Sequence, residues 1–272
     1  MILPLYDMMK RILLIVLAAA VAIAASAKDA AADSTRVLFV GNSYTYYNDM
    51  PAMLRQLAAS TGGGEKMNIA FKAFTPGGCS FRKHVENPAL IKALADGGWD
   101  YVVLQEQSSA PARHSATVAR DTYPYAHILD SLARAGSPGA KVIFYMTWGH
   151  KPGCLTAHKG YPMVDTYEGM QQRLAQSYLE MAYDNDARCA PVGLAWRAVR
   201  AERPDLVLYR NDRSHPSRAG SYLAACVIYA TMLGRDYQSN YTADLDPMLC
   251  EYLQQVALRT VLDNKKLLNI EP

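Results

Sequence analysis

The chain has 272 residues, of which 50% are hydrophobic, so it can build a sizeable core. It carries 28 lysines and arginines against 25 aspartates and glutamates, a formal net charge of +3. This balance argues against a nucleic-acid-binding protein, whose surface would show a basic patch. It favours a ligand that is uncharged or mildly charged.

The first 27 residues have the pattern of an export signal. Lys10 and Arg11 form a basic start, residues 12–23 form an apolar run, and residues 25–27 form a small-residue cleavage site. The apolar run is short for a membrane span of roughly 20 residues, which makes an uncleaved anchor the weaker alternative. We therefore expect an exported protein, periplasmic or secreted, with no stable membrane insertion after cleavage.

Residues 28–272 contain no linker, repeat or low-complexity stretch and are expected to form a single domain. Short apolar runs alternate with stretches of helical period, which is typical of a mostly parallel sheet with helices on both faces, a three-layer α/β/α fold. The predicted strands are 37–40, 67–74, 101–104, 142–147 and 190–194. The predicted helices are 51–59, 119–135, 167–183 and two with apolar stripes over 222–233 and 249–257, the last begun by Asp246 and Pro247.

Cysteine and histidine spacing gives no sign of a metal centre. Five cysteines in an exported chain allow at most two internal disulfides, and their spacing fits no zinc ribbon. His150, Cys154 and His158 are four residues apart, as metal ligands on one helix face would be. Pro152 and Gly153 exclude that helix, so we expect no metal.

A serine follows the first predicted strand at a bend. Ligands of an open α/β sheet bind outside the carboxyl ends of the strands, and Ser43 stands just past such an end. Gly41 allows the backbone to turn sharply there and to expose the side chain. Because Gly-Asn-Ser is also an ordinary turn composition, Ser43 alone does not establish a nucleophile.

An aspartate and a histidine precede the helix that contains residues 222–233. Asp212 stands three residues before His215, and Pro216 follows. Held on one turn, the two side chains can hydrogen-bond, which fixes the imidazole tautomer and stabilises the imidazolium. This is the arrangement of a general base and its orienting group. The plainer alternative makes Asp212 a helix cap and His215 a surface residue.

Candidate donors for an oxyanion follow the second and third strands. Gly77 and Gly78 offer backbone N–H groups with no Cβ in the way. Gln105 or Gln107 can aim a carboxamide at the same point. Together with the N–H of Ser43, these groups would form an oxyanion hole. Each of these signals is weak when taken singly.

Taken together, these motifs resemble those of the SGNH (GDSL-like) hydrolases. The first block matches residues 41–43, Gly78 resembles the glycine of the second block, and residues 212–216 match the last block in full. The third block departs, because Leu-Gln-Glu-Gln-Ser stands where the family has Gly-x-Asn-Asp. Aligning the ends of the two motifs places Gln107 on the family's asparagine, with Gln105 as the alternative.

The phrases Leu-Gln-Glu-Gln-Ser and Met-Thr-Trp-Gly resemble those of a bacterial branch described as a domain of unknown function. The resemblance implies a flavodoxin-like sheet and a serine esterase that needs no cofactor. It makes Ser43 the nucleophile, His215 the base and Asp212 its orienting group. The oxyanion hole would consist of Ser43, Gly78 and Gln107.

The resemblance also implies a small-molecule or glycan ester as substrate, most simply an acetyl ester of a carbohydrate. Tyr44, Trp148 and His150 lie near the active edge and are the expected substrate-binding residues, although tyrosines 44, 46 and 47 equally fit core or rim positions. The alternatives are a lipase-like or thioesterase-like hydrolase of longer acyl chains and a non-catalytic glycan-binding module. The oligomeric state stays open.

Overall fold

The computed structural model describes residues 34–62, 66–154 and 161–271. The expected signal segment 1–27 and His158 lie outside these ranges. Residues Thr35–Pro272 form one compact unit. Across the described ranges, no helix is both long enough and apolar enough to cross a membrane.

Five parallel strands form the centre of this unit. They are β1 (Thr35–Val40), β2 (Ile69–Phe74), β3 (Tyr101–Leu104), β4 (Lys141–Tyr145) and β5 (Arg188–Ala190), in the order β2-β1-β3-β4-β5. The central strands β1 and β3 are apolar and buried on both faces, as expected of a parallel sheet covered on both sides. In this order the topology switches between β1 and β3, so a ligand site is expected at their carboxyl ends.

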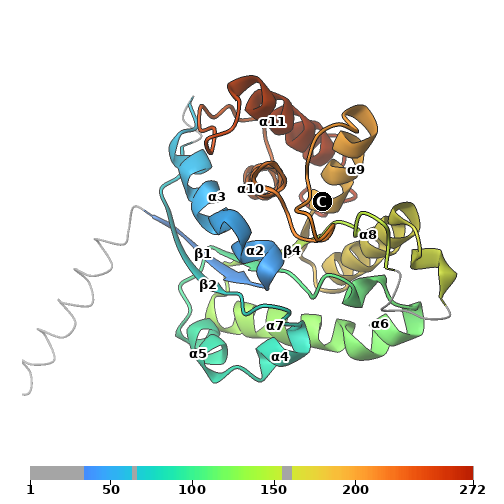
Figure 1. The fold of residues 1–272 in the computed structure, drawn as a ribbon. Coiled ribbons are helices and arrows are strands. Elements are labelled where there is room, and N and C mark those ends of the chain that lie inside the picture. Colours follow the sequence, from blue (N-terminus) through green and yellow to red (C-terminus); the bar gives the residue numbers. More distant parts are fainter. Residues whose placement is uncertain (1–33, 63–65, 155–160, 272) are drawn as a thin grey trace, which may run out of the picture. The chain divides into compact units, whose positions relative to one another are not determined.

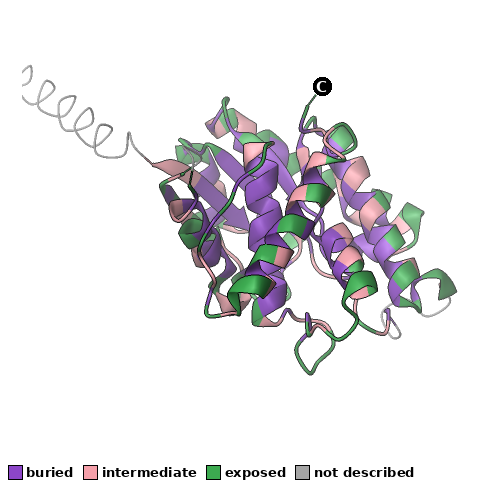
Figure 2. Cartoon of the chain, turned by 90° about the horizontal axis from the view of Figure 1, so that it is seen from above, coloured by how far each residue is buried: buried purple, intermediate pink, exposed green. Residues whose placement is uncertain are grey.

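Helices cover both faces of the sheet (Figure 1). Helices α3 and α10 pack on one face with α11 outside α10, while α5, α7 and α8 lie on the other face. Buried residues follow the strands and the inward sides of the helices (Figure 2). The helix bounds are α2 (Ser43–Tyr46), α3 (Met50–Ala59), α4 (Phe81–Val85), α5 (Pro88–Asp96), α6 (Ser115–Asp121), α7 (Tyr123–Gly136), α8 (Tyr167–Asp184), α9 (Val192–Glu202), α10 (Arg218–Leu233) and α11 (Pro247–Leu262).

The predicted three-layer α/β/α architecture is confirmed, although helices α4, α5 and α9 were not predicted. Two of the predicted elements differ most from the observed ones. The predicted strand 190–194 ends at its first residue, because Pro191 closes β5 and the apolar run continues as the first turn of α9. The predicted helix 119–135 is divided between α6 and α7 at Thr122. Pro124 accounts for the division, since proline is tolerated in the first turn of a helix and not inside one.

The described ranges contain no metal-binding cluster, and four of the buried cysteines form no disulfide. No group of three or more His, Cys, Asp or Glu side chains is placed to hold a metal ion in the described ranges. Cys79, Cys189, Cys226 and Cys250 are buried free thiols. Burial raises the pKa of Cys79, which favours its neutral form.

Candidate active site

Ser43 is the first residue of α2, directly after β1, and its side chain lies at the carboxyl edge of the sheet. Asn42 caps this short helix, because its Oδ1 accepts the N–H of Tyr44 at 3.1 Å. The Nδ2 of Asn42 donates to the carbonyl of Cys79 at 3.0 Å. One asparagine therefore joins the serine turn to the loop that contains Gly78.

Gly41 is required at this turn for close approach to its neighbours. A Cβ at Gly41 would lie 2.6 Å from Thr45 Oγ1 and 2.7 Å from Gln105 Oε1. That Gln105 oxygen accepts hydrogen bonds from the N–H of Asn42 and from Thr45 Oγ1, each at 2.9 Å. The Gln105 amide group donates to the carbonyl of Glu106. Gln105 is buried, and both ends of its amide group bond within the protein. It therefore stabilises the turn at Ser43, and its amide is not directed at an oxyanion.

Ser43, His215 and Asp212 form one hydrogen-bonded chain. His215 Nε2 lies 2.8 Å from Ser43 Oγ, although the two residues are 172 positions apart in the sequence. His215 Nδ1 lies 2.8 Å from Asp212 Oδ2. Asp212 does not cap α10, since Ser217 does so by accepting the N–H of Gly220 at 3.2 Å.

Asp212 is held in its charged form. Burial opposes its ionisation, but hydrogen bonds from the N–H groups of Ser214 and His215 and from the His215 ring together lower the pKa of Asp212. A carboxylate only accepts hydrogen bonds, so His215 Nδ1 carries a proton. In the neutral ring, Nε2 is then the acceptor for the Ser43 hydroxyl, which is the geometry that a general base requires.

Tyr44 and Trp148 are buried and contact Ser214, in the loop that carries Asp212 and His215, so their side chains are not exposed to a substrate. Tyr44 is 2% exposed and Trp148 is 0% exposed. Their rings stack with centroids 4.5 Å apart, and Trp148 stacks in turn on Trp196 at 3.9 Å. Tyr44 Oη bonds to Ser214 Oγ at 2.6 Å, and Trp148 Nε1 donates to the carbonyl of Ser214 at 2.9 Å. The expected substrate contacts of these two rings are therefore replaced by contacts within the protein.

Gln107, after the third strand, and His150, after the fourth, are both partly exposed. Gln107 Oε1 accepts the N–H groups of Ser109 at 2.9 Å and Ala110 at 3.0 Å, which fixes the direction of its amide group. Gln107 Nε2 donates to Ser108 Oγ at 3.2 Å. His150 Nε2 lies 3.4 Å from the same Ser108 oxygen. His150 and Gln107 are thus neighbours through Ser108.

Two backbone donors complete the set of groups expected for an oxyanion. Gly78 has φ +64°, a left-handed conformation that favours glycine, while a Cβ there would meet no atom within 4 Å. In the described part of the chain, the N–H groups of Ser43 and Gly78 have no acceptor. These donors are therefore available to a ligand.

Helix α4 connects the loops that carry these groups. Glu106 is 1% exposed and accepts the N–H of Phe81 at 3.0 Å and that of Gln107 at 2.5 Å. His84 Nε2 donates to the carbonyl of Gly41 at 2.7 Å. Sequence reasoning missed Glu106 and His84, because a charged residue beside an apolar strand and a histidine on a short helix are usually at the surface.

Burial raises the pKa of Glu106 to about 7, against the lowering effects of the Gln107 and Phe81 N–H groups and of Arg113. The folded protein therefore binds this proton more tightly than the unfolded chain does. Its stabilising effect is complete below pH 4.5, the ordinary pKa of the group, and is lost as the pH rises towards 7. We expect the free energy of unfolding to fall by about 3 kcal/mol through this group over that interval.

Denaturant unfolding of the parent and of Glu106→Gln at several pH values checks this expectation. The variant lacks the titrating proton, so the difference between the two stability curves should change between pH 4.5 and 7. Glu251→Gln, on an exposed position of α11, is the matched control and should run parallel to the parent. Parallel curves for Glu106→Gln would mean that folding does not raise the pKa of Glu106.

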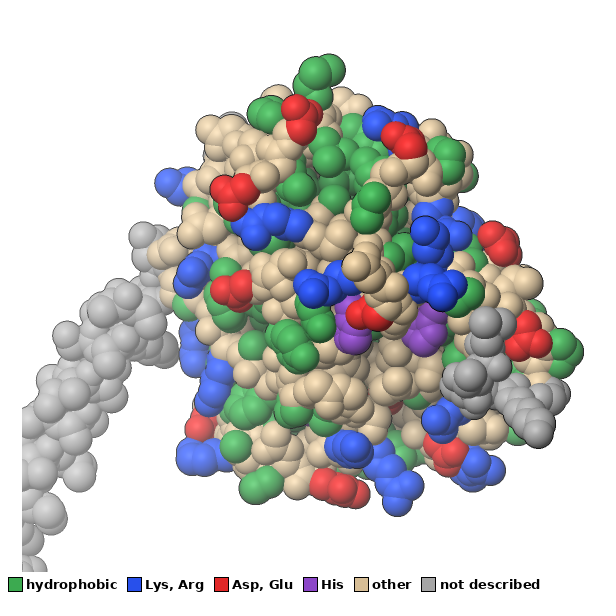
Figure 3. Space-filling model, viewed as in Figure 1, with side chains coloured by type: hydrophobic (Ala, Val, Ile, Leu, Met, Phe, Trp, Pro, Cys, Tyr) green, Lys and Arg blue, Asp and Glu red, His purple; other side chains and the backbone are tan. Residues whose placement is uncertain are grey.

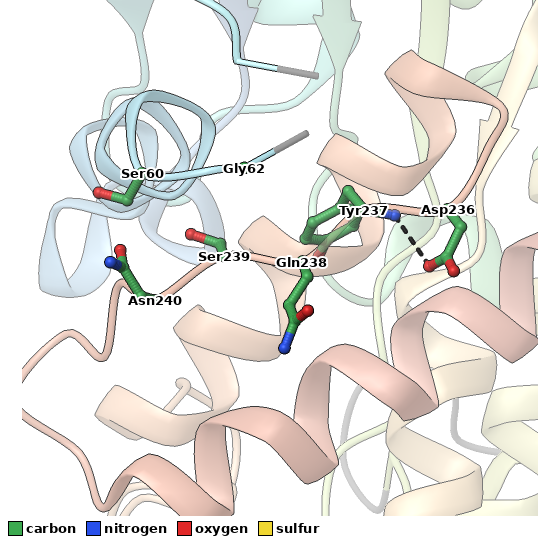
Figure 4. Close-up of a pocket in the computed structure, with 7 residues that line it drawn as sticks. All are labelled: Ser60, Gly62, Asp236, Tyr237, Gln238, Ser239 and Asn240. Atoms are coloured by element: carbon green, nitrogen blue, oxygen red, sulfur yellow. Dashed lines mark hydrogen bonds between the residues drawn. The ribbon is translucent and has the colours of Figure 1, made fainter. Parts of the chain in front are cut away.

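A cavity elsewhere in the compact unit has no arrangement like that of Ser43, His215 and Asp212 among its described lining residues. The space in Figure 4 has a volume of about 520 Å³ and lies between the end of α3 and the loop 236–240. Asp236 is the one titratable carboxylate among its described lining residues, and it accepts the N–H of Tyr237 at 2.8 Å. Ser60, which directly follows α3, lines this cavity, and no histidine is among the described lining residues.

No protein-family model and no curated protein matches the sequence. A solved structure from Slackia heliotrinireducens, described as an SGNH hydrolase, has 31% sequence identity and a TM-score of 0.59 over 73% of this chain and 99% of that chain. The chain belongs to the SGNH hydrolases. It is accordingly an SGNH-type serine hydrolase, and the family expected from the first, second and last sequence blocks is confirmed.

Two further solved structures share the SGNH fold. A DUF4886 family protein from Bacteroides uniformis has 20% identity and a TM-score of 0.69, over 85% of this chain and 95% of that chain. Axe2, an acetylxylan esterase from Geobacillus stearothermophilus, has 17% identity and a TM-score of 0.52, over 74% and 95%. At these identities the likeness concerns the fold alone.

Proposed function

We propose that this SGNH hydrolase is an exported serine esterase that works through an acyl-enzyme intermediate. The observation that carries the proposal is the continuous hydrogen-bonded chain from Ser43 Oγ through His215 to Asp212, with 2.8 Å at each step. A nucleophile, a base and an orienting carboxylate in this order form the minimal machinery of acyl transfer. The signal-like pattern of residues 1–27 supports export.

In the first half of the reaction, Ser43 Oγ attacks the ester carbonyl carbon and His215 Nε2 takes the hydroxyl proton. Asp212 stabilises the imidazolium that results. The oxyanion accepts hydrogen bonds from the N–H groups of Ser43 and Gly78 and from the amide of Gln107. When the tetrahedral intermediate collapses, the carbon–oxygen bond breaks and His215 returns the proton to the leaving alcohol.

In the second half, water replaces the alcohol. His215 takes a proton from the water as its oxygen attacks the acyl carbon, and the same donors hold the second oxyanion. Collapse releases the carboxylic acid, and the proton on His215 returns to Ser43 Oγ. The intact chain of hydrogen bonds disfavours the alternative of a non-catalytic glycan-binding module.

The favoured substrate is an acetyl ester of a carbohydrate. Two tyrosines support this choice: Tyr47 lies with its ring centroid 4.5 Å from that of His215, and Tyr46 stacks beside it and is 45% exposed. Aromatic faces at the rim of a site suit the apolar faces of sugar rings. Axe2, whose fold is shared, is an acetylxylan esterase. A hydrolase of longer acyl chains is the second candidate.

A series of nitrophenyl esters from acetyl to octanoyl separates these two candidates. For an enzyme specific for acetyl esters, we expect kcat/KM to fall at least about tenfold along the series. A longer acyl chain binds better only where its methylenes are buried against apolar side chains, which contributes about 0.8 kcal/mol for each methylene. A site for acetyl groups offers no such apolar groove. We also expect release of acetate from acetylated xylan or another acetylated oligosaccharide. A rise of kcat/KM with acyl length, with no acetate released from such glycans, would assign the enzyme to the lipase-like class.

A further inference from the structure

A cavity of about 410 Å³ opens beside the loop that carries Asp212 and His215, and its lining is strongly basic. Four cationic side chains line it, namely Lys151, Arg200, Arg210 and Arg213. Asp205 is the single carboxylate among the described lining residues, and it accepts a hydrogen bond from Arg203 at 3.4 Å. We call this space the basic cavity.

The four cations of the basic cavity lack carboxylate partners. Within the described ranges, no Asp or Glu oxygen lies within 4.0 Å of the charged nitrogens of Lys151, Arg200, Arg210 or Arg213. Like charges that share a concave surface repel one another and raise the local positive potential. An anion in the cavity would relieve this repulsion.

Two of the arginines are held in place by aromatic rings. The Arg200 guanidinium lies 3.8 Å from the ring centroid of Tyr167 and 5.5 Å from that of Tyr209. Arg210 lies 5.0 Å from the ring centroid of Tyr47. Cation–π contacts of this kind limit the side-chain freedom that an arginine loses when it binds an anion. These two arginine side chains are therefore held in place before any ligand arrives.

Two residues that line the basic cavity, Arg210 and Lys151, have contacts that lead to the loop carrying Asp212 and His215. Tyr47, on which Arg210 lies, has its ring centroid 4.5 Å from that of His215. The N–H of Lys151 donates to the carbonyl of Arg213 at 2.8 Å, and Arg213 is the neighbour of Asp212 in the sequence. Lysine and arginine side chains also flank the histidines on the face seen in Figure 3. Arg210, which lines the cavity, is thus separated from the proposed general base His215 by one aromatic ring, that of Tyr47.

We propose that the basic cavity binds a carboxylate of the substrate, so that the enzyme deacylates an acidic, uronic-acid-containing carbohydrate. The proposal rests on the esterase function proposed above. Arginine favours this ligand because its planar fork forms two parallel hydrogen bonds with a carboxylate. The small net charge of the whole chain, +3, conceals this local concentration of positive charge.

Acetate release from acetylated galacturonic-acid oligosaccharides tests the proposal. They are compared with the same oligosaccharides after each carboxylate is converted to a neutral amide. We expect kcat/KM to be at least about tenfold higher for the acid form, with the preference shrinking as salt screens the charges. Arg210→Gln and Arg213→Gln should each lower the ratio of acid to amide kcat/KM by about tenfold, the loss expected for one charge-assisted hydrogen bond.

The matched control is Arg55→Gln. It removes the same charge from an exposed position on α3, where Arg55 lies over Phe71, and it should leave the acid-to-amide ratio unchanged. Equal rates for the two forms, or an unchanged ratio in both Arg210→Gln and Arg213→Gln, would overturn the proposal.

Two further measurements distinguish failure of this proposal from failure of the esterase function. Hydrolysis of nitrophenyl acetate tests the esterase function without any carboxylate. Calorimetric binding to Ser43→Ala tests the basic cavity without catalysis, and we expect the acid oligosaccharide to bind at least about tenfold more tightly than the amide form. Equal binding of the two forms overturns the assignment of the cavity even in an active esterase.

Discussion

Ser43→Ala and His215→Ala are each expected to lower kcat for nitrophenyl acetate by a factor on the order of 10⁶. Ser43 supplies the attacking oxygen, and His215 moves its proton over the 2.8 Å contact. Because the two groups act as a unit, the double variant should be no slower than either single variant. Activity that remains should come from the oxyanion donors and from substrate binding alone.

These two substitutions should leave the fold intact, since each removes side-chain atoms at the edge of the site and no part of the apolar core. Circular dichroism and thermal unfolding measure this directly. Ser60→Ala removes a hydroxyl directly after α3, beside a different cavity. It is the matched control and should keep full activity. Parental activity in Ser43→Ala would end the mechanism proposed here.

Asp212→Asn is expected to lower kcat by a factor on the order of 10⁴. The asparagine oxygen can still accept the N–H groups of Ser214 and His215, so the loop should keep its conformation. Its amide group, however, faces His215 Nδ1 as a donor, and the imidazole proton then moves to Nε2. In that tautomer His215 cannot accept the Ser43 proton.

Steady-state kinetics and unfolding of Asp212→Asn separate the chemical effect from a structural one. Asp96→Asn removes an exposed carboxylate on α5 that pairs with Lys92, and it should match the parent in kcat and KM. If Asp212→Asn also matched the parent, a group other than Asp212 would have to orient His215.

The amino-acid sequence by itself determined the layers of the fold and the three groups of the proposed triad. Continuous apolar runs such as 37–40 and 101–104 can be buried only in a strand that is covered on both faces, and the second of these runs has the bounds of β3. Ser43, Asp212 and His215 were found because turn residues and a spacing of three leave local signatures.

Only the tertiary structure decided which neighbours of these groups face a ligand. Tyr44 and Trp148 stand beside the motifs in the sequence, but the direction of each ring depends on packing partners such as Trp196 and Ser214. Glu106 is likewise charged in the sequence and buried in the fold, because α4 brings the N–H of Phe81 to its carboxylate.

The basic cavity is likewise visible only in the tertiary structure. Lys151, Arg200 and Arg213 come from three separate segments, and each looks in the sequence like an ordinary solvated charge. Burial, the orientation of side chains and the summed potential of charges depend on contacts between residues that are distant along the chain. Local sequence patterns report the conformation of one segment and contain no information about which other segments will meet it.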